Sequence, residues 1–89
     1  MIYLDNAATT QMSKKALEVY SEYATSRFFN PSATYISAVE MSQKLDEARE
    51  KLKKMLGAKK GDIIFTSGAT ESNNLAVRGS LREGKWDYV

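Results

Sequence analysis

The feature that most constrains this chain is a helical repeat of apolar residues in its middle. From about Ser37 to Leu56, apolar side chains recur at spacings of three and four, and lysine, glutamate and glutamine fill the other positions. The apolar members are Met41, Leu45, Ala48, Leu52 and Met55. A period near 3.6 places them on one face, which predicts a long amphipathic helix. Ser37 and Glu40 have the spacing of a capping box at its start, and Gly57 is placed to close its end.

A shorter helix is predicted before the long one. Ser13 is expected to cap it, and it should run to about Ser26. Its apolar face is formed by Leu17, Tyr20 and Ala24. Residues 2–4 favour an extended segment, and residues 5–10 are small and polar, which favours a loop. Asn30-Pro31 interrupts the chain between the two helices.

The last third of the sequence predicts a strand, a helix and a second strand. Residues 62–66 form a short run of β-branched and aromatic side chains bounded by turn residues, which predicts a buried strand. A helix is expected to open near Ala69 or Thr70 and to continue until Gly84. Residues 86–89 resemble the beginning of another strand. This alternation indicates the α/β class.

Composition narrows the chemistry that this chain performs by itself. The 89 residues include no cysteine and no histidine, which excludes disulfides, thiolate metal sites and imidazole acid/base catalysis. No apolar run is long enough to cross a membrane, and the first residues do not form a secretory signal, so we expect a cytoplasmic protein. A chain of this size buries only about 60 to 65% of its unfolded surface. These facts alone favour a binding module.

The charges leave two interpretations open. The chain has 13 basic and 11 acidic residues, a net charge of +2, and six of the twelve residues in 49–60 are basic. Cations in the second half of a helix interact favourably with its partial negative end. Alternatively, the run belongs to a small interaction module that binds nucleic acid or an acidic partner. The near-balanced charge and the lack of aromatic residues within the run count against nucleic acid.

The segment Thr66-Ser67-Gly68-Ala69-Thr70 lies between the predicted strand and helix. The first turn of a helix carries free N–H groups and a partial positive charge, which together favour an anion. Hydroxyls on Ser67 and Thr70 add donors, and Gly68 has no side chain to obstruct a ligand. The same residue types are common in ordinary helix caps, and the Walker and Rossmann glycine spacings are absent. The spacing alone therefore fits either a phosphate site or a structural cap.

Three blocks of the sequence resemble one enzyme family. Residues 3–10 (YLDNAATT), 30–32 (NPS) and 65–76 (FTSGATESNNLA) resemble the amino-terminal part of NifS/IscS-type cysteine desulfurases. These are pyridoxal 5'-phosphate enzymes of the class V aminotransferase group, with fold type I. The resemblance implies an α/β fold in which residues 1–60 form an amino-terminal segment with two helices. Residues 61–89 would then begin the large cofactor-binding domain with a strand, a phosphate-binding turn, a helix and a strand.

The resemblance also implies two sets of site residues. The first holds the phosphate of the cofactor and consists of Gly68, Ala69 and Thr70. The second lines the cleft that receives the amino-acid substrate and consists of Asn6, Ala7 and Thr9. Asn73 and Asn74 are interpreted as helix-surface amides or amides bonded to the backbone. No metal site is expected.

The family reaction converts L-cysteine to L-alanine and leaves a persulfide on the enzyme, which supplies iron–sulfur cluster assembly and other sulfur-transfer pathways. The resemblance places the cofactor-bearing lysine and the sulfur-accepting cysteine downstream of Val89. We therefore expect a truncated chain that is inactive alone. Its unpaired strands should lead it to form homo-oligomers. The full-length enzyme is expected to bind sulfur-acceptor scaffold proteins. Selenocysteine lyase and other class V aminotransferases remain alternatives within the family.

Two positions depart from the family pattern. Gln11 follows the Ala-Thr-Thr run where the family usually has proline, and Tyr35 stands where the family commonly has a histidine after Asn-Pro-Ser. The first change affects only the direction of the chain, because Ser13 still provides a cap for the following helix. The second removes whatever the histidine contributes near the site.

Overall fold

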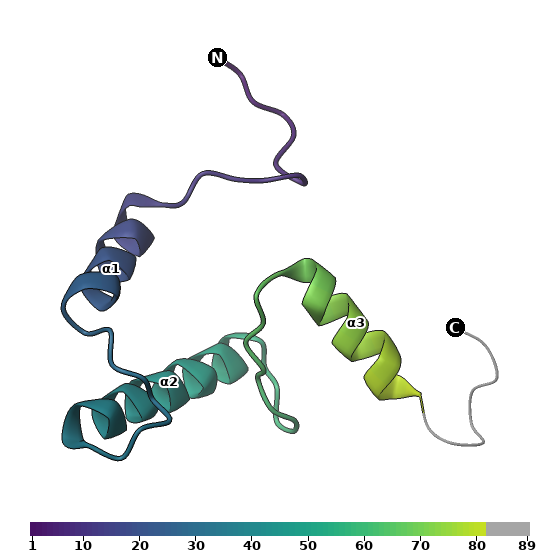
Figure 1. Ribbon diagram of the computed structural model, residues 1–89. Coiled ribbons are helices and arrows are strands. Elements are labelled where there is room, and N and C mark those ends of the chain that lie inside the picture. The colour runs from purple at the N-terminus through teal and green to yellow at the C-terminus, as the bar shows by residue number, and fades with distance from the viewer. Residues whose placement is uncertain (82–89) are drawn as a thin grey trace. The chain divides into compact units, whose positions relative to one another are not determined.

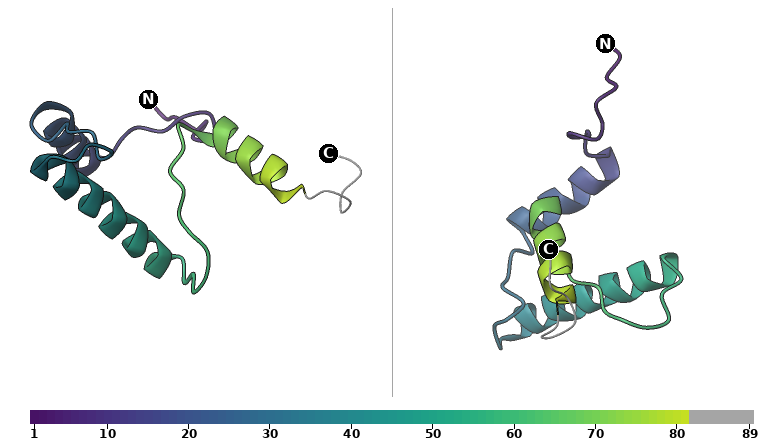
Figure 2. Two further views of the ribbon diagram at one scale, coloured as in Figure 1. Left: turned by 60° about the horizontal axis from the view of Figure 1, so that its bottom comes forward. Right: turned by 90° about the vertical axis from the view of Figure 1, so that its right-hand side faces the viewer.

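The computed structural model describes residues 1–81 and contains three helices in that part of the chain (Figure 1). They are α1 (Lys14–Thr25), α2 (Ile36–Met55) and α3 (Ala69–Ser80). Figure 2 shows the same helices joined by segments without regular secondary structure. The chain divides into two units, Met1–Glu47 and Ala48–Val89. Within residues 1–81, no helix combines the length and apolar character that crossing a membrane requires.

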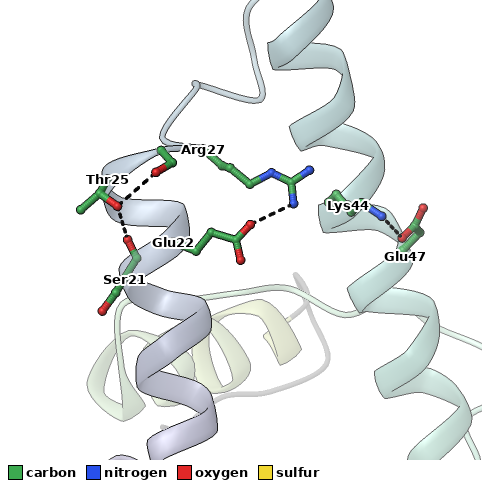
Figure 3. Close-up of polar contacts among 7 residues, drawn as sticks. Ser21, Glu22, Thr25, Arg27, Lys44 and Glu47 are labelled. Atoms are coloured by element: carbon green, nitrogen blue, oxygen red, sulfur yellow. Dashed lines mark hydrogen bonds and ion pairs between the residues drawn. The ribbon is translucent and has the colours of Figure 1, made fainter.

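Helix α1 begins where the sequence predicts. Ser13 has an extended backbone, with φ −64° and ψ 150°, and its hydroxyl accepts a hydrogen bond of 3.2 Å from the amide of Ala16. This side-chain bond satisfies one of the free N–H groups of the first turn. At the other end, the Thr25 hydroxyl donates to the Ser21 carbonyl at 2.7 Å, as Figure 3 shows. The predicted helix from Ser13 to about Ser26 is confirmed.

Aromatic and charged side chains order the connection between α1 and α2. The Arg27 guanidinium lies 3.4 Å from the Glu22 carboxylate (Figure 3) and 5.3 Å from the centre of the Tyr23 ring. The rings of Phe28 and Phe29 stack with their centres 5.1 Å apart. The pair between Arg27 and Glu22 is exposed, so it contributes at most about 1 kcal/mol. These contacts serve mainly to fix the path of the chain.

The predicted break at Asn30-Pro31 is a compact turn. The Ala33 amide donates to the Asn30 carbonyl at 3.1 Å, and the Ser32 amide donates to the Asn30 side-chain oxygen at 2.9 Å. An asparagine side chain that bonds two residues ahead is typical of an Asx turn, and proline suits the second position of a β-turn. The Asn-Pro-Ser block therefore has a local structural reason for its composition.

Helix α2 confirms the amphipathic pattern but begins before the predicted cap. Its first residue is Ile36, and the amides of Ala38 and Val39 both donate to the Tyr35 carbonyl, at 3.0 and 3.1 Å. Ser37 therefore lies in the first turn of the helix, and the capping-box prediction for Ser37 and Glu40 is wrong in position. The Tyr35 carbonyl, which sequence spacing does not reveal, begins the hydrogen-bonding pattern.

The end of α2 is a Schellman motif around Gly57. Gly57 has φ +64°, its amide donates to the Lys54 carbonyl at 3.1 Å, and the Ala58 amide donates to the Lys53 carbonyl at 2.9 Å. These are the two bonds that define the motif, and they satisfy carbonyls that the helix leaves free. The left-handed backbone explains why glycine occupies this position, so the predicted role of Gly57 is confirmed.

The apolar face of α2 is covered unevenly. Within residues 1–81, the only buried side chains are Ala38, at 0% exposure, and Met41, at 7%. Leu45 and Ala48 are half-buried, whereas Met55 is 82% exposed. The sequence identifies the face correctly, but its last turn lies uncovered in the part of the chain that the structure describes.

Helix α3 begins at Ala69 as predicted and is shorter than expected. It ends at Ser80, whose hydroxyl donates to the Val77 carbonyl at 2.7 Å, and Leu81 is extended with φ −72° and ψ 125°. A serine that bonds a carbonyl of the preceding turn competes with continuation of the helix. The predicted end at Gly84 is therefore wrong, and Gly84 itself lies outside the described residues.

The predicted strands are not formed in the described part of the chain. Residues 2–4 and 62–66 have no strand hydrogen bonding, and Ile64 and Phe65 are 65% and 46% exposed, so the prediction of a buried strand is wrong. The Phe65 ring instead lies 5.4 Å from the Arg49 guanidinium. A strand forms only when its backbone pairs with another strand, and the second predicted strand, residues 86–89, lies outside the described residues.

Replacing Gly57 tests the Schellman motif. We expect Gly57→Ala to lower the free energy of unfolding by about 1 to 2 kcal/mol, because a β-carbon disfavours a positive φ. Gly79→Ala is the matched control, since Gly79 lies inside α3 and an added β-carbon meets no atom within 4 Å. That control should raise helix content by circular dichroism, since alanine favours a helix interior by about 0.5 to 1 kcal/mol. Equal effects of the two substitutions would contradict the assignment.

Candidate functional site

The segment that leads into α3 leaves the first turn of the helix without a side-chain cap. Gly68 is the N-cap residue, and no side chain there bonds the helix. The first amide to reach back is that of Ser72, which donates to the Gly68 carbonyl at 3.1 Å. The amides of Ala69, Thr70 and Glu71 precede it and have no carbonyl partner within the helix. The start of α3 thus presents three backbone donors at the positive end of its dipole, the first two on Ala69 and Thr70.

Gly68 keeps the approach to these donors open. Its backbone is extended, with φ 168° and ψ −176°, and a β-carbon built there meets nothing within 4 Å. Any residue adopts this conformation, so the turn does not require glycine for its backbone. The absence of a side chain instead allows a ligand to come close to the amides of Ala69 and Thr70.

Glu71 binds the residue before the cap. Its carboxylate oxygen Oε2 accepts a 2.9 Å hydrogen bond from the Ser67 amide and a 2.6 Å hydrogen bond from the Ser67 hydroxyl. These two bonds, the hydroxyl first and the amide second, lower the pKa of Glu71 from its ordinary value, against a small opposing effect of desolvation. An acidic side chain in the first turn is also favoured by the helix dipole.

Thr66 and Ser72 make a second link across the turn. The Thr66 hydroxyl donates to the Gly68 carbonyl at 3.1 Å, and the hydroxyl oxygens of Thr66 and Ser72 lie 2.5 Å apart. Because a hydroxyl has one proton, Ser72 is the donor in the second bond. Thr66 and Ser67, which both precede the cap, are therefore tied to the first turn of α3 by separate hydrogen bonds, to Ser72 and to Glu71.

Asn74 has a structural partner. Its side-chain amide donates to the Thr70 carbonyl at 2.8 Å, one helical turn earlier. This agrees with the prediction that Asn74 bonds to the backbone. Its amide group is thereby engaged on its own helix.

The donors at the start of α3 suit a phosphate group. Two backbone amides and the Thr70 hydroxyl lie within two consecutive residues, beside a cap residue without a side chain. One negative charge is nearby, on Glu71, and its hydrogen bonds go to Ser67. Within residues 1–81, no group of acidic side chains is arranged to hold a metal ion. The chemistry of the donor set therefore fits an anion.

The second predicted set lies near the amino terminus. The Ala8 amide donates to the Asp5 carbonyl at 3.1 Å, and the Tyr3 hydroxyl donates to the same carbonyl at 2.9 Å. Asn6 and Ala7 therefore occupy the centre of a turn, in the segment predicted to be a loop. This set belongs to the unit Met1–Glu47, whereas residues 66–70 belong to the unit Ala48–Val89.

Comparison with known proteins now assigns the family. The class-V aminotransferase family matches residues 2–87, nearly the whole chain and all of the segment around α3. This chain belongs to the class-V aminotransferase family. The resemblance drawn from three short blocks is confirmed at the level of the family.

The relatives of this class-V chain have cysteine desulfurase or NifS-type names. It is 46% identical over 78 residues to "Cysteine desulfurase IscS" of Dictyoglomus turgidum, covering 88% of this chain and 20% of the relative. It is 44% identical over 80 residues to "NifS/IcsS protein homolog" of Lactobacillus delbrueckii, covering 90% and 21%. "Cysteine desulfurase IscS 1" of Archaeoglobus fulgidus is 39% identical over 89 residues, covering 96% and 23%. The chain spans about a fifth of the length of these relatives. No solved structure matches it significantly.

Sequence reasoning missed the residues that fix the turn. Glu71 and Ser72 lie within the block that carries the family resemblance, but no role followed from their types alone. The available signal was the glutamate in the first turn of a helix, a position from which its side chain reaches back along the chain. Here it reaches Ser67, one residue before the cap.

The lowered pKa of Glu71 predicts how the turn responds to pH. A depressed pKa in the folded state means that the carboxylate stabilises the turn above its unfolded-state pKa, and that this contribution is lost as pH falls through the folded-state pKa. We expect the Ser67 amide resonance to titrate in acid, with a midpoint below that of an ordinary glutamate. Glu71→Gln should abolish this titration. A midpoint at or above the ordinary glutamate value would contradict the hydrogen bonds.

Proposed function

We propose that this chain is the amino-terminal part of a pyridoxal 5'-phosphate-dependent cysteine desulfurase. The observation that carries the proposal is the 46% identity over 78 residues to a relative named cysteine desulfurase, within a family match over residues 2–87. Further relatives with the same name, from Rickettsia and Archaeoglobus, are 39 to 44% identical. These matches include the whole turn at the start of α3.

In this proposal, the start of α3 holds the phosphate of the cofactor. The amides of Ala69 and Thr70 and the Thr70 hydroxyl donate to the phosphate oxygens, and Gly68 leaves room for the group. The uncapped first turn and the open space at Gly68 support this assignment. Binding would be favoured by the partial positive charge of the helix end.

The cofactor, when bound, supplies the electron sink for the reaction. The residues of this chain contribute binding and orientation, with one end of the cofactor fixed by Ala69 and Thr70. We assign Asn6, Ala7 and Thr9 to the lining of the substrate site, where L-cysteine would be converted to L-alanine with sulfur transferred to an enzyme persulfide. The turn that presents Asn6 and Ala7 supports a fixed lining.

The contacts of α2 favour the intrahelical interpretation of the basic run. Lys53 and Lys54 lie in the last turn of α2, where cations interact favourably with the helix end. Lys53 also lies 3.9 Å from the Glu50 carboxylate. Lys44, which precedes the run on the same helix, makes a similar pair with Glu47 at 3.2 Å (Figure 3). Lys53 and Lys54 thus interact with their own helix, which supports the intrahelical interpretation of this part of the run.

Association with further protein is part of the proposal. Large apolar side chains are exposed on each helix, including Tyr20 at 63%, Met55 at 82% and Leu75 at 47%. Burying apolar surface is worth roughly 25 cal/mol per Å², so such faces favour contact with other protein surface. We propose that the enzyme acts as a homo-oligomer and passes sulfur to acceptor scaffold proteins.

A chimera tests the proposed function. Residues 1–89 would replace the matching segment of the Dictyoglomus turgidum relative, to which this chain is 46% identical over 78 residues. We expect the chimera to retain pyridoxal 5'-phosphate, seen by absorbance after gel filtration, and to form alanine and persulfide from L-cysteine.

The isolated 89-residue chain and the unmodified relative are the controls. The isolated chain should form no alanine, because the proposed cofactor lysine is not among its residues. A folded chimera without bound cofactor would contradict the phosphate-site assignment. A chimera that binds the cofactor without desulfurating L-cysteine would contradict the substrate.

A further inference from the structure

The first turn of α3 carries an anionic side chain at the place where an anionic ligand is proposed. Glu71 is its only acidic residue, and acidic groups in a first turn interact with the same partial positive charge that attracts a phosphate. A carboxylate beside a bound phosphate weakens phosphate binding by repulsion between like charges. The presence of Glu71 at this position therefore calls for a different role. The hydrogen bonds of Glu71 indicate what that role is.

Glu71 bonds only one residue in the described contacts of its side chain, and that residue precedes the cap. Both the amide and the hydroxyl of Ser67 donate to Glu71 Oε2, at 2.9 and 2.6 Å. A carboxylate that accepts from a hydroxyl and an amide makes charge-assisted bonds, which are roughly twice as strong as neutral ones. Ser67 is thereby fixed relative to the first turn of α3.

The residue that needs this restraint is Gly68. Glycine has the largest backbone freedom of any residue, and no side chain at Gly68 caps the helix. The restraints come from the two residues that precede it, because Ser67 bonds Glu71 and Thr66 bonds both the Gly68 carbonyl and Ser72. The direction of the following amides depends on this pair of links.

We propose that Glu71 is a positioning residue for the cofactor phosphate. By holding Ser67, it fixes the turn so that the amides of Ala69 and Thr70 are oriented for the phosphate before binding. Orientation in advance raises affinity by reducing the entropy lost on binding. This inference rests on the proposed function, because it takes the phosphate of pyridoxal 5'-phosphate as the ligand.

Comparing two ligands isolates the phosphate. In the apo form of the chimera, dissociation constants are measured by absorbance titration for pyridoxal 5'-phosphate and for pyridoxal, which lacks the phosphate. Glu71→Ala should raise the dissociation constant for pyridoxal 5'-phosphate about tenfold, because both charge-assisted bonds to Ser67 are lost. The constant for pyridoxal should change by less than about twofold, since removing a distant hydrogen bond costs it no direct contact.

Two further variants separate positioning from charge and from folding. Glu71→Gln keeps an oxygen that accepts from the Ser67 amide, so it should restore most of the affinity. Glu47→Ala is the matched control, because it removes the same kind of side chain from an exposed pair with Lys44 on α2 and should leave both constants unchanged. Thermal unfolding of each variant establishes that it is folded. If Glu71→Ala does not fold, Glu71→Asp carries the test, because its shorter side chain keeps the charge, loses the bonds to Ser67 and should weaken the binding of pyridoxal 5'-phosphate but not that of pyridoxal.

Three results would overturn the inference. They are an unchanged dissociation constant for pyridoxal 5'-phosphate in Glu71→Ala, a lower one that shows simple repulsion by the carboxylate, and an equal loss for both ligands. Failure of the unsubstituted chimera to bind pyridoxal 5'-phosphate is a different result. It would overturn the proposed function and, with it, this inference.

Discussion

The helices of this chain depend on how their free backbone groups are satisfied at the ends. Burial contributes little in the described part, where only Ala38 and Met41 lie inside. The ends are instead closed by neighbours along the chain: the Ser13 hydroxyl at the start of α1 and the Schellman bonds around Gly57 at the end of α2. Each bond is worth only about 1 kcal/mol, so these bonds set where the helices begin and end. Most of the stability of a helix comes from packing of its apolar face, which is slight in the described part of the chain.

The candidate site follows from the same constraint. The start of α3 differs from that of α1, because its cap residue has no side chain and the restraint is displaced to Ser67 and Glu71. The backbone donors that a serine would satisfy at an ordinary cap are left for a ligand. The turn is held by the bond between Ser67 and Glu71, and its backbone amides stay accessible. Both properties suit an anion site.

Sequence patterns predicted the parts of this structure whose causes are local. Ser13 and Gly57 act through bonds to residues three to five positions away, so the helix ends they define were accessible from spacing. Residues 62–66 were predicted as a strand from their composition, but a strand depends on a partner, and the described chain supplies none. The donors at Ala69 and Thr70 were predictable because the small residues after Thr66 indicated where α3 begins, although the strand predicted before them is not formed. The bonds of Glu71 were not, because they depend on the conformation of the turn.

The geometry at Gly68 separates the requirement of folding from the requirement of ligand binding, which often coincide at one glycine. The backbone there is extended and the surrounding space is empty, so the folded chain tolerates a larger residue without strain. A ligand bound to the neighbouring amides would be displaced by a larger residue, because the added side chain would compete for the same space. Substitutions of Gly68 that leave folding intact but abolish ligand binding would therefore show that binding, and not folding, requires glycine here.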